Sequence, residues 1–181
     1  PQMREEGHLL DVNSKRVLVA GASSRGLYYG CMTLNQLLKS ESKRLLVPGV
    51  TIQDWPLMKM RGISDDISRG QVSAMKNFKK IIRFLSQHKM NVYMPYLEDM
   101  FIFSKHPLIG KGRGAQMKDE VAELDAYARQ HHVEIIPIFE TLGHFENILL
   151  KPEYVKYAEF PGATCLNPSS EDTYRLLDEM I

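Results

Sequence analysis

Cysteine is scarce in this sequence, and long hydrophobic runs are missing. The only two cysteines, Cys31 and Cys165, lie far apart, with no CxxC spacing and no histidine pair at ligand spacing near them. We therefore predict neither a zinc site nor a disulfide framework, and we expect both cysteines to be small buried apolar residues. No run approaches the roughly 18 apolar residues that a membrane-spanning helix needs. The first residues, PQMREEGH, also lack the apolar core of a signal peptide.

An excess of charge of either sign is also absent. Lys and Arg number 23 and Asp and Glu 22, which gives a formal net charge of +1 and a sequence pI of about 8.2. We therefore expect neither nucleic acid nor a membrane surface as a partner. The length of 181 residues fits one domain, or a small domain joined to part of a larger one. The chain begins without Met, so its start leaves the localisation unknown.

The first 54 residues predict a small α/β unit. Two short apolar runs, 9–12 and 17–20, are split by the turn-forming Asn13 and Ser14, which predicts a β-hairpin. A helix is expected to follow, with Ser23 or Ser24 as its N-cap, and one or two further short strands should lie between Arg44 and Asp54. The apolar face predicted for the helix comprises Leu27, Cys31, Leu34, Leu37 and Leu38.

After Pro56 the pattern alternates between strands and helices. Strands are predicted in MKMRGISDD, MNVYMPYLED and VEIIPIFE, and helices in AMKNFKKIIRFLSQHK, KDEVAELDAYARQHH and SSEDTYRLLDEMI. Three βα units in succession indicate a parallel sheet, either an open doubly wound sheet or a (β/α)8 barrel. The segment GKGRGAQ, from Gly110, has no helix opening directly on it. We therefore predict a flexible surface loop there rather than a phosphate-binding loop.

Each of the three predicted strands ends in a polar cluster. The clusters are SDDISRG at 64–70, YLEDMF at 96–101 and ETLGHFEN at 140–147. The carboxyl ends of parallel strands meet at one edge of a sheet, where such residues line pockets. Taken singly, each cluster can instead be a helix cap, and His144 can be a histidine satisfied under a loop. Together, carboxylates, an arginine, a histidine and aromatic rings suit a neutral polyhydroxylated ligand.

Two segments carry a resemblance to a known family. The stretch EGHLLDV…VLVAGASSRGLYYGCMTLNQLL, followed by TIQDWPLMKMRGISDDISRG, resembles the family 20 glycoside hydrolases, the β-N-acetylhexosaminidases. The resemblance implies that residues 1–54 are the C-terminal part of a small α/β domain that precedes the barrel. It also implies that residues 55–181 are the first three βα units of a (β/α)8 TIM barrel, which is the catalytic domain.

The same resemblance implies roles for individual residues. Arg69, in the motif Asp-x-x-Arg that starts at Asp66, looks like the arginine that grips the O3 and O4 hydroxyls of the terminal sugar. Asp99 stands where the family has a pocket aspartate. His144 matches the histidine of the third-strand motif, and it is expected to support neighbouring carboxylates through hydrogen bonds. The predicted substrate-binding residues are Asp66, Arg69, Glu98, Asp99, Glu140 and His144.

The third-strand motif departs from the usual family pattern. Ile138 replaces its glutamate, Glu140 its aspartate and Leu142 its second proline, while Pro137 and Gly143 are kept. The resulting form, Thr-x-Gly-His-x-Glu, is closer to the hexosaminidase D-like branch of the family. Segments similar to that branch also occur at 151–162 and 166–180.

The chemistry implied by the resemblance is substrate-assisted hydrolysis. The acetamido carbonyl of the sugar attacks its own anomeric carbon, an aspartate orients that amide, and the adjacent glutamate protonates the leaving oxygen. This Asp-Glu pair is expected on barrel strand four, after the helix that begins near Ser169. Asp119-Glu120 should instead open the second helix, and Asp178-Glu179 should face solvent. No catalytic residue, metal or cofactor is therefore predicted in this chain.

The expectation is a fragment of an exo-hexosaminidase that acts on terminal GlcNAc or GalNAc and is inactive by itself. Its partner would be a glycan containing N-acetylhexosamine. The open edge strand VEIIPIF predicts either a longer parent enzyme or self-association. Three alternatives stay open. They are an inactive carbohydrate-binding relative, another (β/α)8 glycosidase such as a family 84 O-GlcNAc hydrolase, and a plain α/β structural domain.

Overall fold

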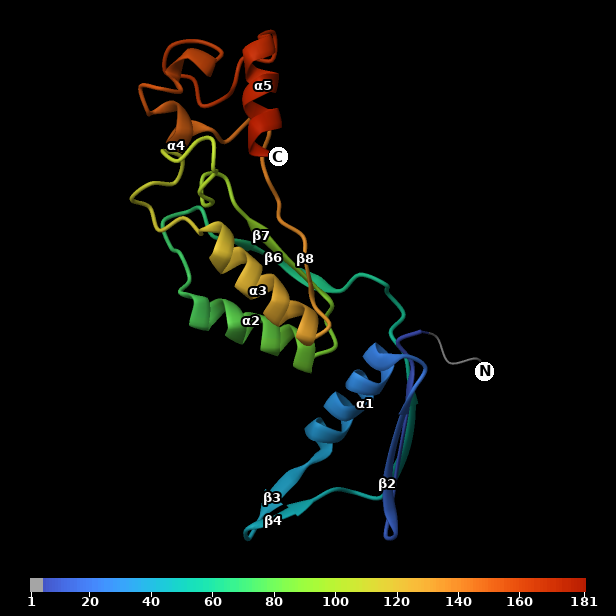
Figure 1. Cartoon of the computed structure of the whole chain (residues 1–181). Coiled ribbons are helices and arrows are strands. Elements are labelled where there is room, and N and C mark those ends of the chain that lie inside the picture. Colours follow the sequence, from blue (N-terminus) through green and yellow to red (C-terminus); the bar gives the residue numbers. More distant parts are fainter. Residues whose placement is uncertain (1–4) are drawn as a thin grey trace. The chain divides into compact units, whose positions relative to one another are not determined.

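The structure, a computed structural model, describes residues 5–181 (Figure 1). These residues form two compact units. The first contains the described residues up to Arg61 together with Arg83–Asn91, and the second contains Gly62–Ile82 and Val92–Ile181. The predicted domain boundary between residues 54 and 55 stays a prediction, and residues 1–4 lie outside the described part. Within 5–181, no helix combines the length and the apolar character needed to cross a membrane.

A three-stranded antiparallel sheet forms the base of the first unit. β1 (His8–Asn13) pairs with β2 (Arg16–Gly21) on one side and with β5 (Val50–Asp54) on the other. The predicted hairpin is thus confirmed. The further strands expected after Arg44 are also confirmed, as β4 (Arg44–Leu46) and β5, whereas β3 (Lys39–Glu41), which pairs with β4, was not predicted.

Helix α1 (Ser24–Leu37) buries a different face from the one predicted. Ser23 is the N-cap, and its Oγ accepts a hydrogen bond from the Gly26 amide at 3.1 Å. The buried residues are Gly26, Tyr29, Gly30 and Thr33, while Leu27 and Cys31 are exposed. The reason is close packing, since a Cβ on Gly30 would lie 2.6 Å from a side-chain carbon of Val19 in β2.

The prediction that both cysteines are buried is also wrong. Cys31 is exposed because it lies on the side of α1 opposite the glycines, and Cys165 is only half-buried. Both are free thiols.

His8 is a buried titratable group in the first unit. Its side chain is 1% exposed, and Nε2 lies 2.9 Å from the Thr33 hydroxyl, while Nδ1 has no hydrogen-bond partner. Burial lowers the pKa of His8, the charge of Lys89 lowers it further, and Asp54 partly opposes both. The folded first unit therefore holds a neutral imidazole.

We expect this histidine to make the first unit sensitive to mild acid. Because the pKa is lower in the folded state, the unfolded chain binds more protons, so stability declines as the pH falls below the unfolded pKa of about 6.5. Urea unfolding at pH 7.5 and at pH 5 measures the effect. The midpoint of the wild type should fall more than that of His8→Gln, which cannot titrate. Equal losses in both proteins would show that other groups cause the acid sensitivity.

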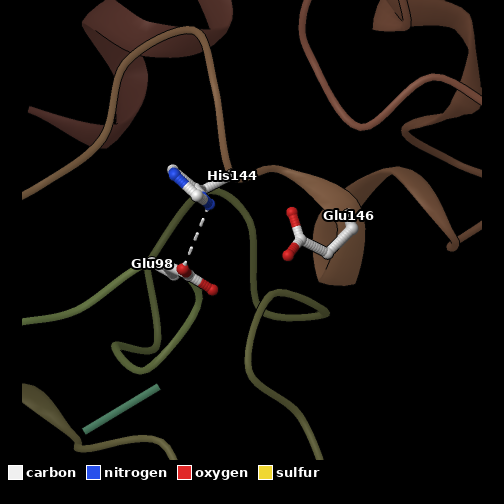
Figure 2. Close-up of side chains that lie close together, drawn as sticks. All are labelled: Glu98, His144 and Glu146. Atoms are coloured by element: carbon white, nitrogen blue, oxygen red, sulfur yellow. Dashed lines mark ion pairs between the residues drawn. The ribbon is translucent and has the colours of Figure 1, made fainter. Parts of the chain in front are cut away.

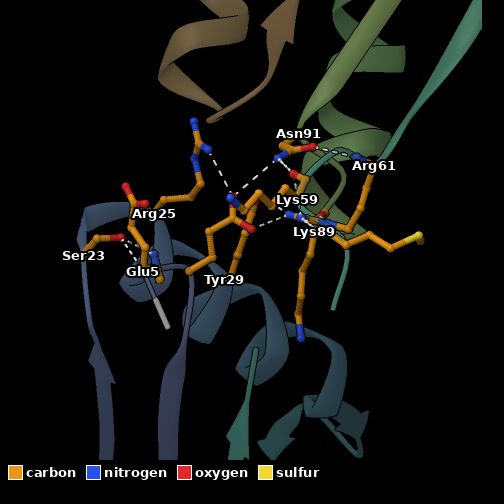
Figure 3. Close-up of polar contacts among 11 residues, drawn as sticks. Glu5, Ser23, Arg25, Tyr29, Lys59, Arg61, Lys89 and Asn91 are labelled. Atoms are coloured by element: carbon orange, nitrogen blue, oxygen red, sulfur yellow. Dashed lines mark hydrogen bonds and ion pairs between the residues drawn. The ribbon is translucent and has the colours of Figure 1, made fainter. Parts of the chain in front are cut away.

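Arg61 is the polar centre of the first unit (Figure 3). Its guanidinium lies 2.8 Å from Glu6, donates to the carbonyl of Lys89 at 2.8 Å and to that of Met58 at 2.5 Å, and reaches the Tyr29 hydroxyl at 3.3 Å. The Arg61 side chain is only 13% exposed, and that of Glu6 is 14% exposed. The Arg61 side chain thus links α1, the segment before β1 and the turns around residues 58 and 89.

The second unit is built on a parallel sheet with the order β6-β7-β8. β6 (Gly62–Asp66) and β7 (Val92–Tyr96) pair along five residues, which confirms the first two predicted strands. β8 (Glu134–Ile135) is much shorter than the segment VEIIPIFE. The amides of Ile136 and Ile138 still donate to β7, but Pro137 between them has no N–H to give.

Helices α2 (Met75–Gln87) and α3 (Lys118–Gln130) lie along one face of this sheet (Figure 1). Phe78 of α2 packs edge to face on Tyr93 of β7, with ring centroids 6.4 Å apart. Phe78, Ile82 and Leu85 of α2 are buried. Beside α3, a largely apolar cavity of about 580 Å³ is lined by alternate residues of β7 and of the segment that continues β8.

The chain after β8, together with Phe103 and Ile109 from the segment between β7 and α3, forms a second, irregular core. It contains α4 (Glu146–Leu149), a 3₁₀ turn (Val155–Tyr157) and α5 (Glu171–Met180). As predicted, Asp119 and Glu120 stand in the first turn of α3, and Asp178 and Glu179 are exposed on α5. The buried members of this core are Phe103, Ile109, Phe145, Ile148, Leu149, Tyr154, Leu166, Leu176, Leu177 and Met180.

Candidate functional site

Arg69 lies where the ends of the three parallel strands meet. It follows β6, and its Nη2 is 2.9 Å from Glu98 Oε1, just after β7, and 3.2 Å from His144 Nδ1, on the segment after β8. Glu98 is almost fully buried, whereas about half of each of the Arg69 and His144 side chains is exposed. The structure therefore brings these three candidates together, with the cationic group facing solvent.

The hydrogen bond between Arg69 and His144 has one possible direction. A guanidinium can only donate, so Nδ1 of His144 accepts. The same Nδ1 is 3.8 Å from Glu98 Oε1, which places the guanidinium between the two as their shared partner.

The backbone is strained at two members of this group. Glu98 has φ +44° and His144 has φ +54°, in the left-handed region that non-glycine residues rarely occupy. Such conformations persist only where the surrounding structure imposes them, and they are frequent at functional sites. The strained backbone therefore marks the same position as the polar cluster.

The two aspartates at the end of β6 have different surroundings. Asp66 accepts hydrogen bonds from the Ser68 amide at 2.9 Å and the Ser68 hydroxyl at 2.7 Å, and it lies 3.5 Å from Arg69 Nε. Burial raises the pKa of Asp66, but the bonds from Ser68 and the charge of Arg69 outweigh it and lower the pKa. Asp65 instead accepts a hydrogen bond at 2.7 Å from the hydroxyl of Tyr93, a buried residue of the core. Only Asp66 faces the candidate site.

Tyr96 is a member of the site that the sequence analysis missed. It is the last residue of β7, and its ring meets the His144 ring edge to face, with ring centroids 6.4 Å apart. Burial and the negative charges of Glu140 and Glu98 raise the pKa of Tyr96 to about 12. Glu140 is thus close enough to act on this group through its charge. The strand-end position of Tyr96 beside two charged residues was the available signal.

Asp99 lies apart from the exposed group. It is 0% exposed, and its Oδ2 is 2.8 Å from Nε of Arg113. Burial raises the pKa of Asp99, while the charge of Arg113 opposes that rise. A contact between Asp99 and a ligand, as predicted from the sequence, would require this buried pair to open.

Glu98, His144 and Glu146 converge on one point (Figure 2). One ligand atom of each lies within 4.8 Å of the others, a spacing that could hold a metal ion. The position already has a cation, however, because the guanidinium of Arg69 contacts both Glu98 and His144. A metal ion would have to displace Arg69, so the donor set fits the arginine better.

The arrangement offers the chemistry of sugar binding. Arg69 presents rigid N–H donors, the exposed Asp66 presents acceptors, and the Tyr96 hydroxyl can do both, while the buried Glu98 holds Arg69 in place. Within the described residues, the two Asp-Glu pairs lie on the helices α3 and α5 and not on the strand-end segments that carry these side chains. The group can therefore hold and orient a polyhydroxylated ligand. The role of each residue in binding stays a prediction.

Comparisons with known proteins point to one family. Residues 1–55 match the family model described as glycosyl hydrolase family 20, domain 2. A β-hexosaminidase of Vibrio furnissii is 27% identical over 213 residues, covering 98% of this chain and 35% of that protein. A β-hexosaminidase of Porphyromonas gingivalis is 30% identical over 165 residues, covering 78% of this chain and 21% of that protein. The chain thus spans about a third or less of these relatives.

Structural similarity extends over almost the whole chain. The solved chitobiase of Flavobacterium johnsoniae superposes with a TM-score of 0.85 at 26% identity, covering 96% of this chain and 29% of that one.

Hexosaminidase D of Bos taurus is 33% identical over 88 residues, which cover 46% of this chain and 25% of that protein. Placement in the hexosaminidase D-like branch stays a prediction.

Fold and site together define a mixed α/β protein with a polar, arginine-centred group at the carboxyl ends of parallel strands. Its relatives by sequence and by structure are glycosidases. The chain is related to glycoside hydrolase family 20, the β-N-acetylhexosaminidases, as its sequence motifs predicted.

Proposed function

We propose that this chain is the N-terminal part of an exo-β-N-acetylhexosaminidase and that the Arg69 group binds the terminal N-acetylhexosamine of a glycan. The observation that carries the proposal is the guanidinium of Arg69, held between Glu98 and His144 where three parallel strands end. It is supported by the relation to β-hexosaminidases along 98% of the chain. We also propose that residues 1–54 precede a (β/α)8 barrel whose first three βα units are residues 55–181.

In this proposal, the residues of this chain bind and orient the sugar. The fork of Arg69 donates to two neighbouring hydroxyls, which a rigid guanidinium does better than an ammonium group. Asp66 and Glu98 hold the fork in place, and His144 accepts from it. Hydrolysis would be substrate-assisted, with retention at the anomeric carbon. The aspartate that orients the acetamide and the glutamate that protonates the leaving oxygen would lie outside these 181 residues.

A second candidate is a binding protein without catalysis. It is favoured by one observation, the position of both Asp-Glu pairs of the described residues on helices and not on a strand-end segment beside Arg69. Self-association through the edge strand β8 also stays a prediction.

An assay with p-nitrophenyl GlcNAc tests the proposal, on the 181-residue chain and on the longer protein that we propose contains it. We expect turnover by the longer protein, inactivity of the short chain, and loss of turnover in the His144→Ala variant of the longer form. In parallel, GlcNAc is titrated into the ¹⁵N-labelled short chain, with 3-deoxy-GlcNAc, which lacks one of the two hydroxyls proposed to meet Arg69, as the control. Binding without turnover in either protein would support the second candidate. Absence of both binding and turnover would overturn the sugar-site proposal.

A further inference from the structure

Arg113 contacts all three strand-end segments of the second unit, through two hydrogen bonds and one ion pair. Its Nη2 donates to the carbonyl of Ser68 at 2.8 Å, after β6, and its Nη1 donates to Oδ1 of Asn147 at 3.1 Å, in α4 after β8. Its Nε lies 2.8 Å from Oδ2 of Asp99, after β7. Asp99 is fully buried, and the other two contacts are partly buried.

Each partner of Arg113 is the chain neighbour of a residue at the candidate site. Ser68 precedes Arg69, Asp99 follows Glu98, and Asn147 follows Glu146. The guanidinium of Arg113 does not touch the exposed group itself. It instead fixes the backbone positions from which Arg69 and Glu98 reach one another.

The backbone of the segment GKGRGAQ, which carries Arg113, depends on its glycines. Gly110, Gly112 and Gly114 all have positive φ, at +72°, +79° and +81°. Gly110 is buried so close to the segment after β7 that an added Cβ would lie 2.4 Å from the carbonyl oxygen of Asp99. The predicted loop thus lies at the surface over most of its length, with Lys111, Gly112 and Gly114 exposed, while its two ends, Gly110 and Gln116, are buried.

We propose that Arg113 is a positioning residue, which sets the spacing of the three strand-end segments and thereby the geometry of Arg69, Glu98 and His144. The binding role of this geometry rests on the proposed function. A guanidinium can donate two hydrogen bonds in different directions while its charge pairs with a carboxylate, because its N–H donors lie in one rigid plane. A lysine would keep the ion pair with Asp99 and lose the bonds to Ser68 and Asn147.

The test compares Arg113→Lys and Arg113→Gln with Lys111→Gln, an exposed cation in the same loop. Three quantities are measured on the 181-residue chain. They are the urea midpoint, the GlcNAc dissociation constant from the NMR titration, and the Nε–Hε cross-peak of Arg69, assigned with Arg69→Lys. We expect both Arg113 variants to stay folded, to bind GlcNAc about tenfold more weakly, and to shift or lose the Arg69 cross-peak. Lys111→Gln should match the wild type in all three.

The outcomes separate positioning from plain stability. If Arg113 only stabilises the fold, its variants lower the urea midpoint, while the folded chain keeps the wild-type dissociation constant and Arg69 cross-peak, and the inference is overturned. If the wild type does not bind GlcNAc, the sugar-site proposal fails, and the Arg69 cross-peak alone decides on Arg113. A shifted cross-peak in Arg113→Lys, with none in Lys111→Gln, would then uphold the positioning role.

Discussion

Replacing Arg61 with Met is expected to lower the free energy of unfolding of the first unit by about 2–4 kcal/mol. Removing one partner of a buried ion pair typically costs roughly 3–5 kcal/mol, because the other charge is left without compensation. The lower range applies here because Arg61 and Glu6 keep 13% and 14% of their side-chain exposure. The carbonyls of Met58 and Lys89 would also lose their donor.

Arg16→Met is the matched control for this prediction. Arg16 also pairs with a carboxylate, Asp11 at 3.1 Å, but its side chain is 63% exposed. Exposed pairs contribute about 0–1 kcal/mol, so this variant should unfold almost as the wild type does. The single tryptophan, Trp55, lies in the first unit and reports its unfolding by fluorescence in urea. Equal midpoints for the two variants would show that the Arg61 contacts add nothing beyond a surface pair.

The second large effect is expected at Arg69, on binding rather than on folding. We expect Arg69→Lys to weaken GlcNAc binding by about ten- to a hundredfold, since a charged hydrogen bond contributes roughly 1.5–3 kcal/mol and lysine cannot form a two-donor fork. Lysine keeps a positive charge near Glu98, which is 2% exposed, so the fold should be retained. NMR titration gives the dissociation constant, and circular dichroism checks folding.

Arg175→Lys provides the control for Arg69. Arg175 pairs with Asp172 on the surface of α5, and both side chains are largely exposed. This variant should bind GlcNAc as the wild type does. If Arg69→Lys also binds like the wild type, Arg69 does not grip the sugar hydroxyls, and the resemblance has misplaced that role.

Most of the secondary structure could be predicted because it follows local patterns. The hairpin and the alternating strands and helices depend on residues that are near neighbours in the chain. The face of α1 could not be predicted in this way. Its leucines suggested the buried side, but the decisive fact is the approach of Gly30 to Val19 in a neighbouring strand. Likewise, one proline was enough to reduce a seven-residue apolar run to the short strand β8.

Some residues of the candidate site could likewise be predicted from local patterns, and others could not. Arg69, Glu98 and His144 could be named because each follows a predicted strand, and parallel strands bring such positions together. Tyr96 was within reach of the same reasoning, because it ends β7. The partner of Asp99 was not, since Arg113 lies on a glycine-rich loop and its three contacts join distant parts of the sequence. Contacts between residues so far apart in the sequence could not be predicted from a local pattern.

The left-handed backbone of Glu98 and His144 has a consequence for how this sequence can change. At such positions glycine would relieve the conformational cost, which is about 1–3 kcal/mol for each strained residue. A chain selected for stability alone would therefore be expected to acquire glycine at both sites. Keeping a carboxylate and an imidazole there means that the molecule gives up folding energy for the sake of two side chains. Variants that favour a more stable protein would tend to remove the very groups that surround Arg69.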